Sequence, residues 1–123
     1  MSSSDEVRAS HILIKHEGSR NKNSWKDPEG IYISKTTKES AIILLKIFRD
    51  EIKNGNWAFE NLAFRFSDCS SAKHGGDLEI ICGYFGHGKM QKPFEDATYK
   101  LKVGEISDIV ETASGVHIIK RTA

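Results

Sequence analysis

Short apolar runs typical of β-strands stand at both ends of the chain. The first runs from Val7 to Lys15, and two more cover Ile106 to Thr112 and Val116 to Arg121. Residues 113–115, Ala-Ser-Gly, separate the last two with a glycine late in the turn, which is typical of a three-residue β-hairpin. The sequence therefore predicts three strands, one at the start of the chain and two at its end.

The middle of the chain carries apolar residues at helical spacing. A capping box, with Thr36 as N-cap and Glu39 three residues later, predicts a helix that runs to about residue 54 and ends at Gly55. Further helices are expected over Trp57 to Phe66 and from about Pro93 to Lys102. The predicted inner faces of the three helices are Ala41, Leu45, Phe48 and Ile52, then Phe59, Leu62, Ala63 and Phe66, then Phe94, Ala97, Thr98 and Leu101.

Length and charge narrow the possible classes of protein. The 123 residues fit one domain, expected to span 1–123 with a flexible N-terminus at 1–6 and an exposed, partly basic loop at 17–35. A net charge of +1 gives no general reason to expect nucleic acid or a membrane as partner. The N-terminus lacks the apolar run of a signal peptide, and the run from Ala41 to Leu45 is too short to span a bilayer.

Two cysteines without a secretory signal indicate free thiols in a reducing compartment, so we expect the cytoplasm, the nucleus or both. Ile43 and Ile47 fall on the outer side of the first predicted helix. They form either a small exposed patch or a contact with a partner. The expected state is a monomer, which light scattering over a range of concentrations would test.

The stretch from Ser67 to Leu78 is the most distinctive part of the sequence: Ser-Asp-Cys-Ser-Ser-Ala-Lys-His-Gly-Gly-Asp-Leu. It follows the second predicted helix and ends in a Gly-Gly turn, so Cys69 lies at a helix-to-loop junction among small polar residues. His11 and His117 each belong to a terminal apolar run. If the first and last strands pair, the two histidines lie together under the cysteine loop.

The ordered set of His11, Cys69, the run Met90 to Phe94 and the run Ser114 to His117 resembles the parvulin family of peptidyl-prolyl cis/trans isomerases. The chain most resembles the phosphorylation-dependent, Pin-type branch, in the form found in plants without a WW domain. The resemblance covers almost the whole chain and implies an α+β fold. That fold is a four-stranded antiparallel sheet surrounded by about four helices, with a short fourth strand near 83–86.

The resemblance also implies roles for individual residues, with no cofactor and no metal. The implied catalytic residues are His11, Cys69, His117, Ser70, Thr112 and Ser114. The implied proline pocket consists of Leu78, Met90, Gln91 and Phe94. The implied phosphate-binding residues are Lys15, Arg20 and Lys22. The implied partners are proteins that contain phosphorylated Ser/Thr-Pro bonds.

Prolyl isomerisation requires neither a metal nor a covalent step. Amide resonance sets a rotation barrier of ~18–20 kcal/mol. A catalyst must favour the twisted amide, through an apolar pocket for the proline ring and through hydrogen bonds aimed at the twisted geometry. For Cys69 we favour a non-covalent role, because nucleophilic catalysis needs a base that activates the thiol and sequence spacing cannot show one.

Two positions depart from the family pattern. The phosphate clamp of the family typically has two adjacent arginines, whereas Arg20 is followed here by Asn21, with Lys22 as a point charge one residue later. Residues 79–82, Glu-Ile-Ile-Cys, look inserted beside the proline pocket, either as a plain loop extension or as a change in the site. The alternative to a phosphate clamp is a solvated basic loop.

Three other classes of function stay open at this point. A zinc site would use the Cys-x4-His-x7-Cys-x4-His pattern, although this is not a familiar zinc-finger spacing. Its ligands would be Cys69, His74, Cys82 and His87. A non-catalytic phosphopeptide-binding module or chaperone-like holdase with the same fold is the second. A thiol hydrolase is the third, without an oxyanion-hole motif to support it.

Overall fold

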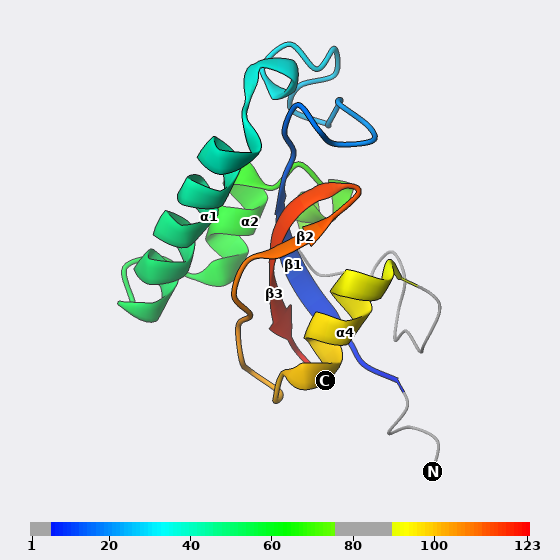
Figure 1. Cartoon of the computed structure of the whole chain (residues 1–123). Coiled ribbons are helices and arrows are strands. Elements are labelled where there is room, and N and C mark those ends of the chain that lie inside the picture. Colours follow the sequence, from blue (N-terminus) through cyan, green and yellow to red (C-terminus); the bar gives the residue numbers. More distant parts are fainter. Residues whose placement is uncertain (1–5, 76–89) are drawn as a thin grey trace.

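The computed structural model describes residues 6–75 and 90–123 (Figure 1). The strands are β1 (Ala9–Ile14), β2 (Val110–Thr112) and β3 (Gly115–Arg121). The α-helices are α1 (Lys38–Lys53), α2 (Phe59–Phe66) and α4 (Lys92–Lys100), and the 3-10 helices are η2 (Ile33–Lys35) and η3 (Ser70–His74). The α+β prediction is confirmed. The fourth strand expected near 83–86 lies outside the described residues.

Within the described residues the sheet has three antiparallel strands in the order β1-β3-β2, so the last strand lies between the other two. The pairing of β1 with β3 runs from Ala9 opposite Arg121 to Ile14 opposite Val116. This confirms that the two ends of the chain meet in one sheet. Helices α1 and α2 cover one face of that sheet and α4 covers the other (Figure 1).

The pleat of β1 and β3 divides their buried residues between two cores, because successive side chains point to opposite faces. Ile12 and Ile118 pack with α1 and α2 in the larger core. Ala9 and Ile119 pack with Phe94 of α4 in the smaller one. His11 lies two residues after Ala9 and His117 two residues before Ile119, so each histidine shares a face of the sheet with that residue. Both histidines therefore face α4.

Helix α1 begins one residue later than predicted. Its N-cap is Thr37, whose side-chain oxygen accepts the N–H of Ser40 at 3.1 Å. The hydroxyl of Thr36 donates instead to the carbonyl of Tyr32 at 2.8 Å, so the predicted capping box with Glu39 is wrong. The predicted end is confirmed, since Asn54 is the C-cap and Gly55 follows with φ of +78°.

Most predicted inner positions of the helices are buried, and Ile43 and Ile47 are exposed as expected. Phe66 is an exception, with 39% of its surface exposed. It is the last residue of α2 and lies at the edge of the larger core, where its ring contacts that of Phe48 at a centroid distance of 5.0 Å.

Strand β2 is shorter than the predicted run from Ile106 to Thr112. Ile106 forms only an isolated bridge with Lys120. Next to it, the hydroxyl of Ser107 accepts the N–H of Ile119 at 2.9 Å, in the place of a backbone carbonyl. This side-chain bond interrupts the ladder, so regular pairing begins only at Val110.

The loop at 17–35 is largely exposed, and one buried carboxylate holds it in shape. Asp27 is buried, and its Oδ1 accepts the N–H of Ile31 at 3.0 Å. Its Oδ2 accepts the N–H groups of Tyr32 at 3.1 Å and Ile33 at 2.9 Å. In the described part of the chain, no helix is long and apolar enough to cross a membrane.

Candidate active site

The register of β1 against β3 brings His11 and His117 together. His11 pairs with Ile119 and His117 with Leu13, so the histidines are diagonal neighbours on the α4 face. Their Nδ1 atoms lie 3.0 Å apart, and the ring centroids are 5.2 Å apart with an interplanar angle of 22°. Both residues are buried. The predicted meeting of the two histidines is confirmed.

Phe94 supports this pair from α4. Its ring meets His11 edge-on at a centroid distance of 5.4 Å and His117 at 5.3 Å. It is only 2% exposed, and the half-buried Met90 packs against the same small core. Two residues of the implied proline pocket therefore lie beside the histidines. Leu78, the third apolar member, lies outside the described residues.

A chain of polar contacts continues from His117 to the hairpin turn between β2 and β3. The Nε2 of His117 lies 2.7 Å from the hydroxyl of Thr112, which also accepts the N–H of Ser114 at 3.1 Å. Gln91, at the N-cap of α4, donates to the hydroxyl of Ser114 at 2.8 Å and accepts the N–H of Ala113 at 3.0 Å. Gln91 thus fastens the turn to α4 through its amide group.

Cys69 is half-buried at the N-cap of η3. Burial raises the pKa of its thiol, but the interaction with His11 and hydrogen bonds from Ser71 lower it by more, and the resulting pKa is about 6. The Nε2 of His11 is buried and has no hydrogen-bond partner among the described residues.

These pKa shifts set the charges of Cys69 and His117. A thiol with a pKa of about 6 is mainly thiolate at neutral pH, and a thiolate only accepts hydrogen bonds. Burial and the charge of His11 hold the pKa of His117 well below its usual value, so His117 is a neutral imidazole. Its single N–H serves either His11 or Thr112.

Two of the implied phosphate-binding residues reach the cysteine. Lys15, Arg20 and Asn21 line a small hollow together with Cys69, Ser70 and Ser114. The backbone N–H of Arg20 donates to Ala113 at 2.9 Å, which ties the basic loop to the hairpin turn. Lys22 is exposed and does not line this hollow. The structure therefore brings Lys15 and Arg20, but not Lys22, to three of the implied catalytic residues, Cys69, Ser70 and Ser114.

Three residues that the sequence did not indicate fasten the loop at 17–35 to the segment that carries Cys69: Trp25, Lys26 and Asp68. The indole N–H of Trp25 donates to the carbonyl of Ser67 at 2.8 Å, and Lys26 pairs with the buried Asp68 at 3.0 Å. The only available signal was the position of Asp68 directly before Cys69. An aspartate that follows a helix is usually solvated, so that signal was weak.

The zinc alternative gains no support from the geometry. No group of three or more His, Cys, Asp or Glu side chains in residues 6–75 and 90–123 could hold a metal ion. Two of the proposed ligands, Cys82 and His87, lie outside those ranges, as does the apparent insertion at 79–82.

Comparison with known proteins agrees with this arrangement. The family model of the PPIC-type PPIase domain matches residues 11–123. The chain is 66% identical over 123 residues to peptidyl-prolyl cis-trans isomerase Pin1 of Arabidopsis thaliana, with 100% of both chains covered. It is 64% identical over 121 residues to the protein of the same name from Malus domestica, covering 98% of this chain and 97% of that one.

Solved structures give the same result. Peptidyl-prolyl isomerase ESS1 from Candida albicans has a TM-score of 0.88 and 47% identity, covering 97% of this chain and 63% of that one. The solution structure of TbPIN1 has a TM-score of 0.84 and 47% identity, covering 98% of this chain and 99% of that one. The chain therefore belongs to the PPIC-type peptidyl-prolyl cis-trans isomerases, as the ordered motifs of its sequence implied.

Proposed function

We propose that this isomerase acts on Ser/Thr-Pro bonds in proteins, where the Ser or Thr is phosphorylated. The observation that carries the proposal is that Lys15 and Arg20 line the same hollow as Cys69 and Ser114. A phosphate dianion in this hollow meets two cations, and the guanidinium of Arg20 offers it a bidentate fork. The Pin1 names of the Arabidopsis thaliana and Malus domestica relatives add support.

The departure at Asn21 determines which cations matter. Asn21 lines the hollow, but it carries no charge. Lys22, the expected replacement, is exposed and does not line the hollow. Phosphate selectivity in this chain therefore rests on Lys15 and Arg20, with a smaller, solvent-screened contribution from Lys22.

The proposed catalysis is non-covalent. As an amide twists, its carbonyl oxygen loses negative charge, so a nearby anion destabilises the planar amide more than the twisted one. The Cys69 thiolate is such an anion, and its interaction with His11 favours the charged form. A Cys69→Asp variant keeps an anion at this position and is expected to retain part of the activity, whereas complete loss in a folded variant would favour a nucleophilic thiol.

The test is exchange NMR on a matched pair of peptides, one with phosphoSer-Pro and one with Ser-Pro. We expect the wild-type protein to accelerate exchange of the phosphorylated peptide selectively. An Arg20→Ala variant should lose most of this selectivity, while the matched control Lys22→Ala should keep it. Equal acceleration of both peptides by the wild type would remove phosphate selectivity, and binding without acceleration would make the protein a recognition module.

A further inference from the structure

The segment that carries Cys69 is joined to the end of β1 by three hydrogen bonds, and a fourth lies within the segment. The hydroxyl of Ser67 accepts the N–H of Leu13 at 3.0 Å and that of Cys69 at 3.4 Å. The N–H of Asp68 donates to the carbonyl of Leu13 at 2.7 Å. The Oδ2 of Asp68 accepts the N–H of Lys15 at 2.8 Å. Asp68 therefore contacts β1 through both its backbone and its side chain, immediately before the cysteine.

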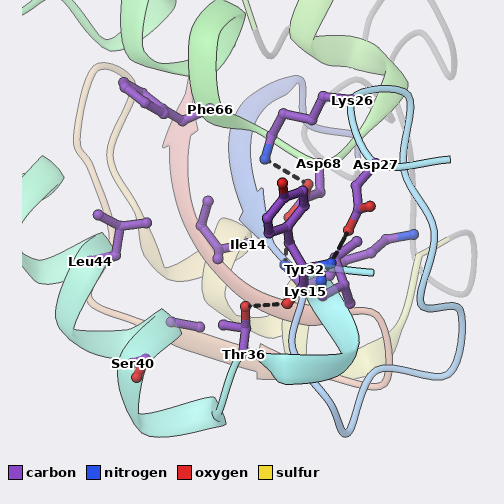
Figure 2. A pocket seen from close by; sticks show the side chains of 12 residues that line it. Ile14, Lys15, Lys26, Asp27, Tyr32, Thr36, Ser40, Leu44, Phe66 and Asp68 are labelled. Atoms are coloured by element: carbon purple, nitrogen blue, oxygen red, sulfur yellow. Dashed lines mark hydrogen bonds and ion pairs between the residues drawn. The ribbon is translucent and has the colours of Figure 1, made fainter. Parts of the chain in front are cut away.

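The same segment also holds the basic loop. Figure 2 shows the Nζ of Lys26 directed at the carboxylate of Asp68, and these groups are 3.0 Å apart. The indole of Trp25 donates to the carbonyl of Ser67 at 2.8 Å. The side chain of Asp68 is only 3% exposed, against 36% for that of Lys26. A carboxylate this buried is costly to the fold without partners, so Lys26 is required to compensate its charge.

Asp68 also lies between two hollows of the surface. On one side is the site hollow, with Cys69 and Ser114. On the other is the hollow of Figure 2, whose wall includes Lys26 and Tyr32. Lys15 and Asp68 line both. A shift of Asp68 therefore moves the cysteine and the proposed phosphate-binding lysine together.

We propose that Asp68, held by Lys26, is a positioning residue that sets Cys69 against His11 and keeps Lys15 beside it. The inference rests on the proposed function, in which Cys69 and Lys15 act on the substrate. Neither Asp68 nor Lys26 needs to touch the substrate in this role. Both act through the segment Ser67–Cys69 and through the backbone of Lys15.

The experiment compares Asp68→Ala with Asp68→Asn, and uses Asp108→Asn as the matched control. Asp108 is also paired with a cation, Arg49, but its side chain is 94% exposed. The first readout is the pH dependence of Cys69 alkylation, followed by mass spectrometry of the peptide that contains Cys69. The second is kcat/KM for the phosphorylated peptide. Circular dichroism confirms that each variant is folded.

The sign of the change in the thiol pKa separates positioning from a direct effect of charge. Loss of a neighbouring negative charge alone would lower the pKa of Cys69, and by the same amount in both variants. Displacement of Cys69 from His11 raises it. We expect a rise in Asp68→Ala, a smaller rise in Asp68→Asn because its amide oxygen still accepts the N–H of Lys15, and no change in Asp108→Asn.

For catalysis we expect kcat/KM to fall about ten- to hundredfold in Asp68→Ala, as is typical when a reacting group is displaced by about 1 Å. An alkylation midpoint that is unchanged or lower in Asp68→Ala would overturn the inference, whatever the activity. A raised midpoint with unchanged kcat/KM would uphold the positioning role but contradict the proposed role of Cys69. The two failures are therefore distinguishable.

A double-mutant cycle with Lys26→Met covers the case in which Asp68→Ala does not fold. Lys26→Met leaves the buried carboxylate unpaired, so it should raise the alkylation midpoint on its own. Combining it with Asp68→Asn should add little, because both changes break one ion pair. Additive effects would show that Lys26 does not act through Asp68 and would overturn that part of the inference.

Discussion

Removal of the Asp27 carboxylate should loosen the whole basic loop. The side chain accepts three backbone N–H groups, from Ile31, Tyr32 and Ile33, at 2.9–3.1 Å. In Asp27→Ala these three donors lose their partner at once. Because Trp25 and Lys26 of this loop contact Ser67 and Asp68, unfolding free energy and hydrogen exchange, rather than activity, report on the loop itself.

The expected magnitude follows from the number of bonds. A hydrogen bond to a charged group contributes about 1.5 kcal/mol or more to stability, so three such bonds give about 4–5 kcal/mol. Water can reach part of this surface loop once it opens, which offsets some of the loss. We therefore expect the free energy of unfolding to fall by about 3 kcal/mol.

The assay is equilibrium unfolding in urea, followed by circular dichroism, with Asp108→Ala as control. Asp108 is a highly exposed partner of Arg49 at 3.6 Å, so its removal should cost less than about 0.5 kcal/mol. Amide hydrogen exchange should show lost protection at residues 31–33 first. A loss below about 1 kcal/mol for Asp27→Ala, with protection at 31–33 intact, would refute the assignment of Asp27 as the anchor of the loop.

Three further predictions concern the cysteine, the hairpin and the first helix. Alkylation of Cys69 should follow a pKa of about 6, and a midpoint near 8.5 would contradict this. Because folding lowers this pKa, its contribution to the free energy of unfolding is full above the unfolded pKa and is lost as the pH falls through about 6. Gly115→Ala should lower the free energy of unfolding by about 2–4 kcal/mol, since φ is +149° and a Cβ would lie 2.7 Å from the carbonyl oxygen of Ile14. Gly55→Ala, where φ is +78° and the space is open, should lower it by only about 1–2 kcal/mol in the same urea assay. Thr37→Ala should lower stability by about 1 kcal/mol through loss of the N-cap, and no change in thermal unfolding would show that the cap is dispensable.

The general architecture was predictable because it depends on hydrophobic periodicity. The terminal apolar runs pair as expected, and this pairing alone places His11 and His117 together, with Cys69 delivered by the end of α2. Thr112 and Ser114 also join the cluster through the hairpin turn. These residues could be found because their positions follow from topology.

The features that sequence did not predict depend on single hydrogen bonds. Thr36 and Thr37 are equally good N-caps, and only the tertiary position of Tyr32 decides between them. Ser107 interrupts a strand because its hydroxyl happens to face the N–H of Ile119. The burial of Asp68 depends on Lys26, a residue 42 positions earlier, and no periodicity reports such a pair.

The diagonal of histidines has a consequence for how this protein is made. His11 and His117 are separated by 106 positions in the sequence, and the strand that carries His117 is the central one of the described sheet. During synthesis from the N-terminus, β1 therefore waits for β3 before it has a partner, and such long-range pairing is slow to form. An emerging chain acquires its catalytic pair only when synthesis has reached β3. This catalyst of a slow step in the folding of other proteins is thus inactive through most of its own synthesis.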